Sequence, residues 1–366
     1  MPEAVIVATG RSPIGRAGKG SLVNVRPDDM LGYIVQKVLE KVPELPHDQI
    51  EDLICGCGFP QGETGMNVGR LAVFLSGLPD SVPGTTVNRF CASSLQSIRM
   101  AYHAIKAGEA NAIVAAGVEC CSRVNTIPHA EDINIRLSGP EAIADAYITM
   151  GMTAENVAVK YGITREEMDQ FAYEIIPVTT PDGTEVSQDD GIRSSTTLEG
   201  LAQLKPVFKE DGRVTAGNAC PLNDGAAAVV VMSDEKAKQL GIKPLARILG
   251  SAVSALDPAI MGVGPIEACR KVFAQTGMTV DDIDVVELNE AFAAQVIPVS
   301  REVAWDMEKL NPHGGAIALG HPFGMTGARI MTTLLNDLQT LDKTYGLETM
   351  CVGGGQGMAM IVERLN

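Results

Sequence analysis

Two hydrophobic patterns alternate along the chain: short continuous apolar runs, and longer stretches with an apolar residue every three to four positions. Continuous short runs are typical of buried strands, and the longer spacing is typical of helices with one buried face. The first run covers residues 4–8. The stretch 27–39 opens with a proline and two acidic residues, and Leu31, Ile34 and Val38 lie on one of its faces. This alternation predicts a layered α/β fold.

The same analysis predicts elements throughout the chain. Further strands are expected at 52–56, 112–118, 226–232, 349–352 and 358–363, and helices are expected within 88–107, after a turn, and at about 326–338. Each end of the chain therefore contains a strand–turn–helix–strand unit with a Cys or His at the turn. This repetition predicts two duplicated α/β halves.

The middle of the chain is more polar and richer in turns than either end. We therefore expect an N-terminal half at 1–121, completed by about 223–243, an inserted loop lobe at 122–222, and a C-terminal half at 244–366. Within the lobe, a short helical pattern runs into a strand-like one with almost no connection. The join at 172–174 predicts either a deletion or residues absent from the sequence.

Composition and charge narrow the function classes. The 366 residues are 45% hydrophobic, enough for two or three packed units. The net charge of −16 disfavours nucleic acid and anionic membranes as partners. No apolar run approaches the ~20 residues of a membrane span, and no secretion signal is apparent. We expect a cytoplasmic protein without membrane insertion. Its eight cysteines should be reduced, and the Cys55-Gly56-Cys57 pair has no second pair at zinc spacing, so no metal is expected.

Cys91 lies where a predicted strand and loop enter the helix within 88–107. At that position, free backbone N–H groups and the positive end of the helix dipole favour thiolate over thiol. Cys91 is therefore a candidate nucleophile. The alternative for a cysteine at a helix start is a buried structural residue.

His321 lies between Gly320 and Pro322 in a glycine-rich turn. A histidine held in such a tight turn is a candidate general base, with a structural histidine as the alternative. The remaining histidines occur in ordinary helix or loop contexts and are expected to have no catalytic role: His47, His103, His129 and His313.

Cys351 ends a predicted strand and precedes a run of glycines at 353–355 and 357. This run lacks the lysine of a phosphate-binding loop. Residues without Cβ also let backbone N–H groups approach a developing oxyanion. Cys351 is then a candidate second acid–base thiol, and the alternative is one more buried core cysteine.

Taken together and in order, several segments resemble the signature segments of the thiolase family. They are 88–94, 289–293, 320–322 and 351–357, with further agreement at 150–156, 216–219 and 223–225. The resemblance covers essentially the whole chain. It implies the thiolase fold, with two duplicated α/β halves packed as a layered α-β-α-β-α core plus an inserted loop lobe. It also implies acyl transfer between Cys91 and CoA, which cleaves or forms 3-ketoacyl-CoA with acetyl-CoA as product or substrate.

The resemblance further implies roles for single residues. Cys91 matches the nucleophile that becomes acylated, and His321 matches the base that deprotonates it. Cys351 matches the acid–base group at the α-carbon of acetyl-CoA. Asn289 matches the residue that holds a water and forms, with His321, an oxyanion hole for the enolate. The N–H groups of Cys91 and Gly353 match the second hole.

CoA is implied as a substrate, with no tightly bound cofactor. The residues that match positions lining its pocket are Met150, Arg193, Phe208, Ala216, Cys220, Met261 and Phe292. Arg193 is expected near the nucleotide phosphates. Cys220 stands where the family often has serine, so its contact with pantetheine is expected to be a weaker hydrogen bond.

Departures from the family pattern bear on the substrate. Thr149-Met150-Gly151 stands where acetoacetyl-CoA-specific members have His-Met-Gly, and the loop at about 124–145 is short. Both features favour a degradative 3-ketoacyl-CoA thiolase, as in β-oxidation of fatty acids, over a biosynthetic acetoacetyl-CoA thiolase. A decarboxylating ketoacyl synthase of the same fold would have His in place of Cys351. A catalytically silent CoA- or lipid-binding relative would have lost Cys91, His321 or Cys351. A homodimer or homotetramer is also implied.

Overall fold

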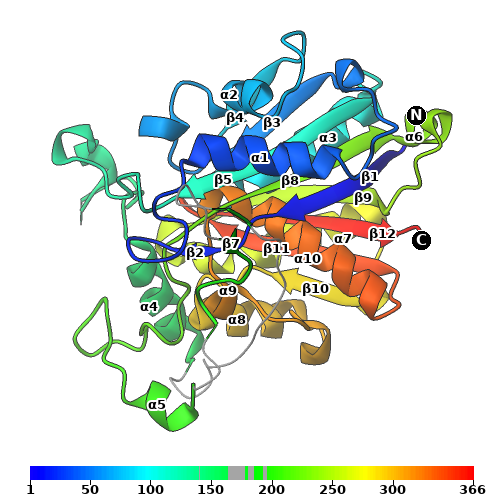
Figure 1. Ribbon diagram of the computed structural model, residues 1–366. Helices are drawn as coiled ribbons and strands as arrows, with labels where there is room; N and C mark the ends of the chain where they lie inside the picture. Colours follow the sequence, from blue (N-terminus) through cyan, green and yellow to red (C-terminus); the bar gives the residue numbers. More distant parts are fainter. Residues whose placement is uncertain (140, 164–177, 180–184, 193–195) are drawn as a thin grey trace.

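A computed structural model describes residues 1–139, 141–163, 178–179, 185–192 and 196–366 of the chain (Figure 1). Two predictions fall outside these residues: the placement of Arg193 near the CoA phosphates, and the short join at 172–174.

The first half is built on a mixed sheet. Its strands are β1 (Ala4–Arg11), β2 (Gly15–Arg16), β3 (Asp52–Gly56), β4 (Gly84–Val87), β5 (Ala112–Cys120) and β8 (Asn223–Ser233). Their order is β1-β8-β5-β3-β4, with β2 beside β8. β3 runs parallel to β4 and β5, whereas β8 is antiparallel to β5 and β1. β8 therefore returns the chain to the first half, as its apolar run predicts.

The second half repeats this plan. Its strands are β9 (Ala246–Ala255), β10 (Val285–Leu288), β11 (Tyr345–Val352) and β12 (Gln356–Arg364). Their order is β9-β12-β11-β10. The β10–β11 pair is parallel, and the other pairs are antiparallel. This order and these directions match those of β1-β8-β5-β3 in the first half strand for strand. The duplication is confirmed. The two halves join where Val5 and Ile6 of β1 pair with β9, so their strands form one sheet.

Helices lie outside and between the two halves. α1 (Pro27–Leu39) and α2 (Val68–Leu75) cover the outer face of the first half, where their apolar residues share one core with β3, β5 and β8. α7 (Gly264–Thr276) and α8 (Ala293–Val303) cover the outer face of the second half. α3 (Ser93–Ala107) and α10 (Thr326–Thr340) lie between the halves in a core to which both contribute. The predicted α-β-α-β-α layering is confirmed (Figure 1).

The remaining elements belong mostly to the middle of the chain. They are α4 (Met150–Tyr161), β6 (Val178–Thr179), β7 (Glu185–Val186), α5 (Leu198–Ala202), α6 (Asp234–Leu240) and α9 (Ala316–Leu319). Figure 1 shows α4 and α5 at the lower left, beside the layered core.

The two central helices approach each other closely at their first turns. A Cβ added at Gly327 of α10 would lie 2.3 Å from the Leu95 backbone nitrogen on α3. The Ala328 N–H donates to Ser94 Oγ at 2.9 Å. The start of α10 is therefore fixed against the start of α3, and the short turns that precede these helices come together.

Candidate active site

Cys91 lies in a 3₁₀ turn, Phe90–Ala92, between β4 and α3. Two side chains fix this turn. Asn88 Oδ1 accepts from the Phe90 N–H at 2.8 Å, and Ser93 Oγ accepts from the Arg89 N–H at 2.9 Å. Phe90 has a φ of 42°, so these bonds also hold a backbone conformation that a phenylalanine seldom adopts. The Cys91 side chain is buried as a result.

Burial decides the protonation state of Cys91. It raises the pKa of the thiol to about 12, and the N–H groups of Gly353 and Cys91, which hydrogen bond to the sulfur, lower the pKa only in part. The expectation that the helix start favours thiolate is therefore wrong for the resting site, because α3 begins two residues later and desolvation outweighs the N–H donors. The resting group is a thiol.

His321 follows α9 and is fixed from several sides. Its backbone N–H donates to Asn223 Oδ1 at 2.9 Å. Gly320 has a φ of 118°, and a Cβ there would lie 2.7 Å from the Asn223 side chain, so the tight turn requires glycine. The imidazole packs edge-on against Phe323, with ring centroids 5.0 Å apart. The side chain is 1% exposed.

Both ring nitrogens of His321 have polar neighbours. Nδ1 lies 2.6 Å from Thr326 Oγ1, and Nε2 lies 3.3 Å from Asn289 Nδ2. Burial, with a smaller effect from the positive charge of Arg329, lowers the pKa of His321 to about 3. The imidazole is therefore neutral at rest, as a proton acceptor must be.

Asn289 directly follows β10, and its backbone N–H donates to the Thr349 carbonyl on β11 at 3.0 Å. The side chain is buried. Asn289 Oδ1 has no hydrogen-bond partner within the described ranges, while Nδ2 contacts His321. A buried amide oxygen without a partner can accept a hydrogen bond from a ligand or solvent molecule in the site.

Cys351 is the penultimate residue of β11, opposite Gly357 of β12. Burial raises the pKa of Cys351 well above its usual value, and negative charge on Cys91 or Cys220 acts in the same direction. Cys91 also raises the pKa of Cys220. Cys220 also packs against the apolar cluster that contains Cys351, and the turn of Cys91 contacts β11.

The turn after β11 brings Gly353 to Cys91. Its N–H bonds to the Cys91 sulfur, and a Cβ at Gly353 would meet the Phe90 ring at 3.3 Å. Gly354 and Gly355 have φ angles of 77° and 79°, which glycine adopts without strain. The glycine run is thus required by the turn that aims one N–H at the Cys91 sulfur.

The predicted CoA residues form a wall beside Cys351. Met261 and Phe292 belong to the same apolar cluster as Cys351, and Met150 and Cys220 pack against that cluster. Phe208 packs edge-on against Phe292, with ring centroids 6.3 Å apart. Ala216 is exposed on the turn 215–218, which leads directly to Cys220. The predicted set, apart from Arg193, therefore comes from neighbouring parts of the lobe and the second half.

Glu119, at the end of β5, was missed by the sequence analysis. Its buried carboxylate accepts from the Gly58 N–H at 2.8 Å and from the Gly324 N–H at 3.0 Å, so it ties the loop after β3 to the His321 turn. Burial raises the pKa of the Glu119 carboxyl to about 7, although the N–H groups that donate to it lower the pKa in part. In the sequence, Glu119 could have been noticed because it is a carboxylate at the end of a continuous apolar run.

Glu290 and Thr326 were missed as well. Glu290 accepts from Asn311 Nδ2 at 2.6 Å and from the Ile317 N–H at 3.2 Å, which fixes the segment leading to His321. Burial raises its pKa to about 7. Thr326 contacts the imidazole itself. The spacing of residues along the sequence does not indicate the contacts of Glu290 or of Thr326, because each contact joins residues from different turns.

The site thus combines two buried thiols, a neutral imidazole, an amide and backbone N–H groups. This set is suited to acyl transfer with proton transfer at carbon. Within the described ranges, no group of three or more His, Cys, Asp and Glu side chains could hold a metal ion. No helix in the described part of the chain is long and apolar enough to cross a membrane.

Comparisons with known proteins agree with this chemistry. A family model described as "Thiolase, N-terminal domain" matches residues 4–235, and one described as "Thiolase, C-terminal domain" matches residues 242–364. A β-ketoadipyl-CoA thiolase of Acinetobacter baylyi is 44% identical, with both chains fully covered. A 3-ketoacyl-CoA thiolase of Bacillus subtilis is 42% identical, covering 99% of this chain and 100% of the relative. The crystal structure of the Bacillus anthracis acetyl-CoA acetyltransferase is 38% identical, with a TM-score of 0.91, covering 100% of this chain and 99% of that one.

Proposed function

The chain belongs to the thiolase family and is an acyltransferase, and from that premise we propose that it cleaves 3-ketoacyl-CoA with free CoA through an acyl group on Cys91. The observation that carries this proposal is the convergence of three distant turns. Cys91 precedes α3, His321 precedes α10, and Cys351 is the penultimate residue of β11. The 3₁₀ turn at Cys91 contacts both the turn after His321 and β11.

The first half-reaction transfers the acyl group to sulfur. His321 Nε2 takes the Cys91 proton, and the thiolate attacks the C3 carbonyl of the substrate. The C2–C3 bond breaks with both electrons on C2, which gives the enolate of acetyl-CoA, and Cys351 donates its proton to C2. The acyl group remains on Cys91 as a thioester, so the energy of the cleaved bond is not lost to hydrolysis.

The second half-reaction releases the acyl group. The Cys351 thiolate takes the proton of the incoming CoA thiol, and the CoA sulfur attacks the acyl-Cys91 carbonyl. Cys91 leaves as a thiolate and recovers its proton from His321. The N–H groups of Cys91 and Gly353 stabilise the tetrahedral oxyanion, and Asn289 with His321 stabilises the enolate. Each such donor set contributes roughly 10²–10³ in rate.

CoA is expected to bind along the wall of Met150, Phe208, Met261 and Phe292. The packing of Phe208 on Phe292, with Phe208 41% exposed, supports an apolar surface for the pantetheine arm. Ala216 and Cys220 are proposed to contact the same arm, and Arg193 the nucleotide phosphates. The domain limits 1–121, 122–222 and 244–366, and the cytoplasmic location, stay predictions.

We propose the degradative direction with acyl chains longer than acetoacetyl. Thr149 before Met150-Gly151 supports this choice, and so do relatives named 3-ketoacyl-CoA thiolase and β-ketoadipyl-CoA thiolase. A relative from Chromobacterium violaceum is named acetyl-CoA acetyltransferase at 42% identity, so biosynthetic acetoacetyl-CoA synthesis is the second candidate. The presence of Cys91, His321 and Cys351 opposes both a silent binding role and a ketoacyl synthase role.

The test is a series of 3-ketoacyl-CoA substrates of increasing chain length. Loss of absorbance of the magnesium-complexed substrate on addition of CoA measures thiolysis. We expect kcat/KM to rise beyond acetoacetyl-CoA. A maximum at acetoacetyl-CoA would favour the biosynthetic reading, and no loss with any chain length would refute the thiolase reaction.

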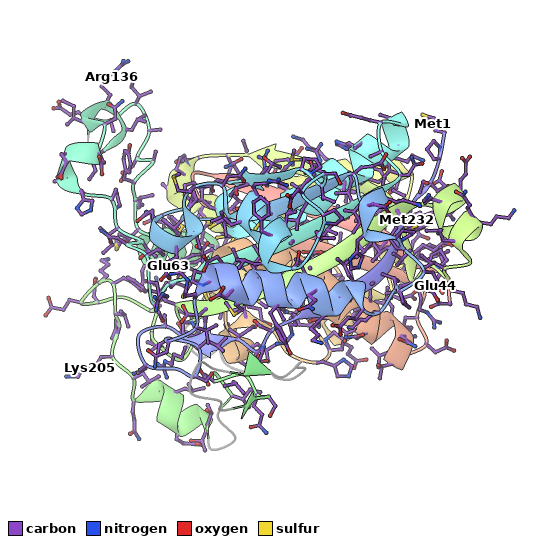
Figure 2. All side chains as sticks on the ribbon, turned by 45° about the horizontal axis from the view of Figure 1, so that its top comes forward. Met1, Glu44, Glu63, Arg136, Lys205 and Met232 are labelled. Carbon is purple, nitrogen blue, oxygen red and sulfur yellow. The ribbon has the colours of Figure 1, made fainter. Side chains whose placement is uncertain are left out.

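We also propose a homodimer or homotetramer. β4 is an edge of the sheet, and an open edge offers unpaired backbone groups to a second copy. Near it, Met66 is 90% exposed and Phe74 50% exposed. Figure 2 shows Arg136 at the end of an arm that extends away from the body, and Ile135 on this arm is 84% exposed. Light scattering after size exclusion tests the assembly, and a monomer at micromolar concentration would refute it.

A further inference from the structure

Thr326, the first residue of α10, contacts the imidazole of His321 on the side away from Asn289. Thr326 Oγ1 lies 2.6 Å from Nδ1, and Asn289 Nδ2 lies 3.3 Å from Nε2. All three side chains are buried. The position of the ring proton therefore follows from which atoms can donate and which can accept.

The Thr326 hydroxyl has a single proton, and the Pro322 carbonyl oxygen accepts it at 2.8 Å. Pro322 lies four residues earlier, and threonines near helix starts commonly donate to the carbonyl at this spacing. With its proton used in this way, Thr326 Oγ1 can only accept from Nδ1. Nδ1 of the neutral ring then carries the proton, and Nε2 carries the lone pair.

The amide of Asn289 supports the same assignment. Its Nδ2 is a donor and faces Nε2. With the proton on Nε2 instead, two donors would face each other within the buried site, at the cost of a lost hydrogen bond. Thr326 and Asn289 thus favour one tautomer from opposite sides of the ring.

We infer that Thr326 is a positioning residue that holds His321 with its lone pair on Nε2, ready to take the Cys91 proton. This inference rests on the proposed function, in which His321 is the proton acceptor. Nε2 takes the proton from the Cys91 sulfur and later returns it, while the Nδ1 proton stays on the ring. Thr326 exchanges no proton with the substrate.

A hydroxyl at Nδ1 differs from a carboxylate in its effect on the base. A carboxylate would stabilise the imidazolium by charge, whereas the neutral hydroxyl fixes the ring and leaves its basicity low. The buried positive charge of Arg329 acts in the same direction on the pKa of His321. The imidazolium formed in the first half-reaction is therefore a strong acid, which favours return of its proton to Cys91 in the second half-reaction.

The experiment compares three variants in single-turnover acylation of Cys91. Thr326→Val keeps the shape and removes the hydroxyl, and Thr326→Ser restores the hydroxyl. Thr332→Val is the matched control, because Thr332 on the same helix also donates to a carbonyl four residues earlier, Ala328, at 2.9 Å. We expect Thr326→Val to lower the acylation rate roughly 10- to 100-fold with little change in KM. Thr326→Ser should recover most of the rate, and Thr332→Val should match the wild type.

Nitrogen-15 NMR of histidine-labelled protein gives a readout that does not depend on activity. The His321 signals, assigned by their loss in His321→Asn, should show a protonated Nδ1 and an unprotonated Nε2 in the wild type. Thr326→Val should produce a mixture of tautomers. A wild-type His321 that is protonated on Nε2 overturns the inference. So does an active wild type if the Thr326→Val variant acylates Cys91 as fast as the Thr332→Val control. Failure of the wild type to cleave any 3-ketoacyl-CoA refutes the proposed function instead, and the NMR measurement still decides the tautomer.

Discussion

Replacing Gly327 by alanine tests whether the contact between the central helices sets the geometry of the site. The added Cβ would lie 2.3 Å from the Leu95 backbone nitrogen and 2.6 Å from the Leu95 Cβ. Ordinary contacts begin at 3.4 Å. The starts of α3 and α10 must therefore separate by about 1 Å, since a close-packed interior leaves no space to absorb the overlap.

Two consequences follow from this displacement. Overpacking of a core costs about 1–3 kcal/mol, so the free energy of unfolding should fall by that amount. The displacement also moves the turn of Cys91 away from that of His321, and a misplacement of ~1 Å in an active site can cost ~10² in rate. Gly327→Ala should therefore lose both stability and activity although Gly327 touches no substrate in the proposed reaction.

Urea denaturation and single-turnover acylation measure the two effects. Gly200→Ala is the control, because Gly200 lies in helix α5 and its Cβ would meet only Thr197 Oγ1, at 3.3 Å. That substitution should be neutral or stabilising by up to ~1 kcal/mol. If Gly327→Ala unfolds and acylates like the wild type, the closeness of the two helices does not control the site, and the reasoning is refuted.

The remaining predictions concern the thiols and pH. Cys91→Ala should give no acyl adduct by mass spectrometry, and an adduct on another cysteine would contradict the assignment. Cys351→Ser should still acylate at Cys91 yet turn over at least ~10²-fold more slowly, as expected for a lost acid–base group, and unchanged turnover would remove Cys351 from the mechanism. Burial raises the pKa of Glu119 and Glu290 from 4.5 to about 7, so the folded state holds these protons more tightly than the unfolded chain. The resulting stability is fully present below about pH 4.5 and is lost as the pH rises to about 7. Urea denaturation at about pH 5 and pH 8 should show this loss, with a smaller loss in Glu290→Gln, and a rise would contradict it.

Much of the fold could be predicted because buried elements leave clear patterns. The bounds of α1 follow from its initial proline and its apolar face, and they agree with the prediction. β11 is longer than predicted, Tyr345–Val352 rather than 349–352, because Glu348 interrupts the apolar run. This glutamate is nevertheless fully buried, opposite Glu287 of β10 and within reach of the charge of Arg329. Sequence patterns treat a glutamate as exposed, so a buried charged cluster cannot be recognised from them.

The turns that carry the predicted catalytic residues come together as the sequence suggests, but the electrostatics there could not be predicted. Cys91 and His321 each precede a helix in matching units of the two halves, so their convergence follows from the duplication. The protonation state of Cys91 depends on how much solvent the folded site excludes, which spacing does not reveal. The contacts of Glu119 with Gly58 and Gly324 join positions far apart in sequence, and no local pattern indicates them.

The repeated strand order has a consequence for how such chemistry can arise in one polypeptide. Two identical copies related by symmetry would present the same side chain at both helix starts, either two sulfurs or two rings. Joining the copies by a peptide chain removes that restriction, because each copy can then mutate by itself. In the proposed mechanism this freedom is what matters: a thiol stands before one central helix and an imidazole before the other, across a pseudosymmetric interface inside a single protomer.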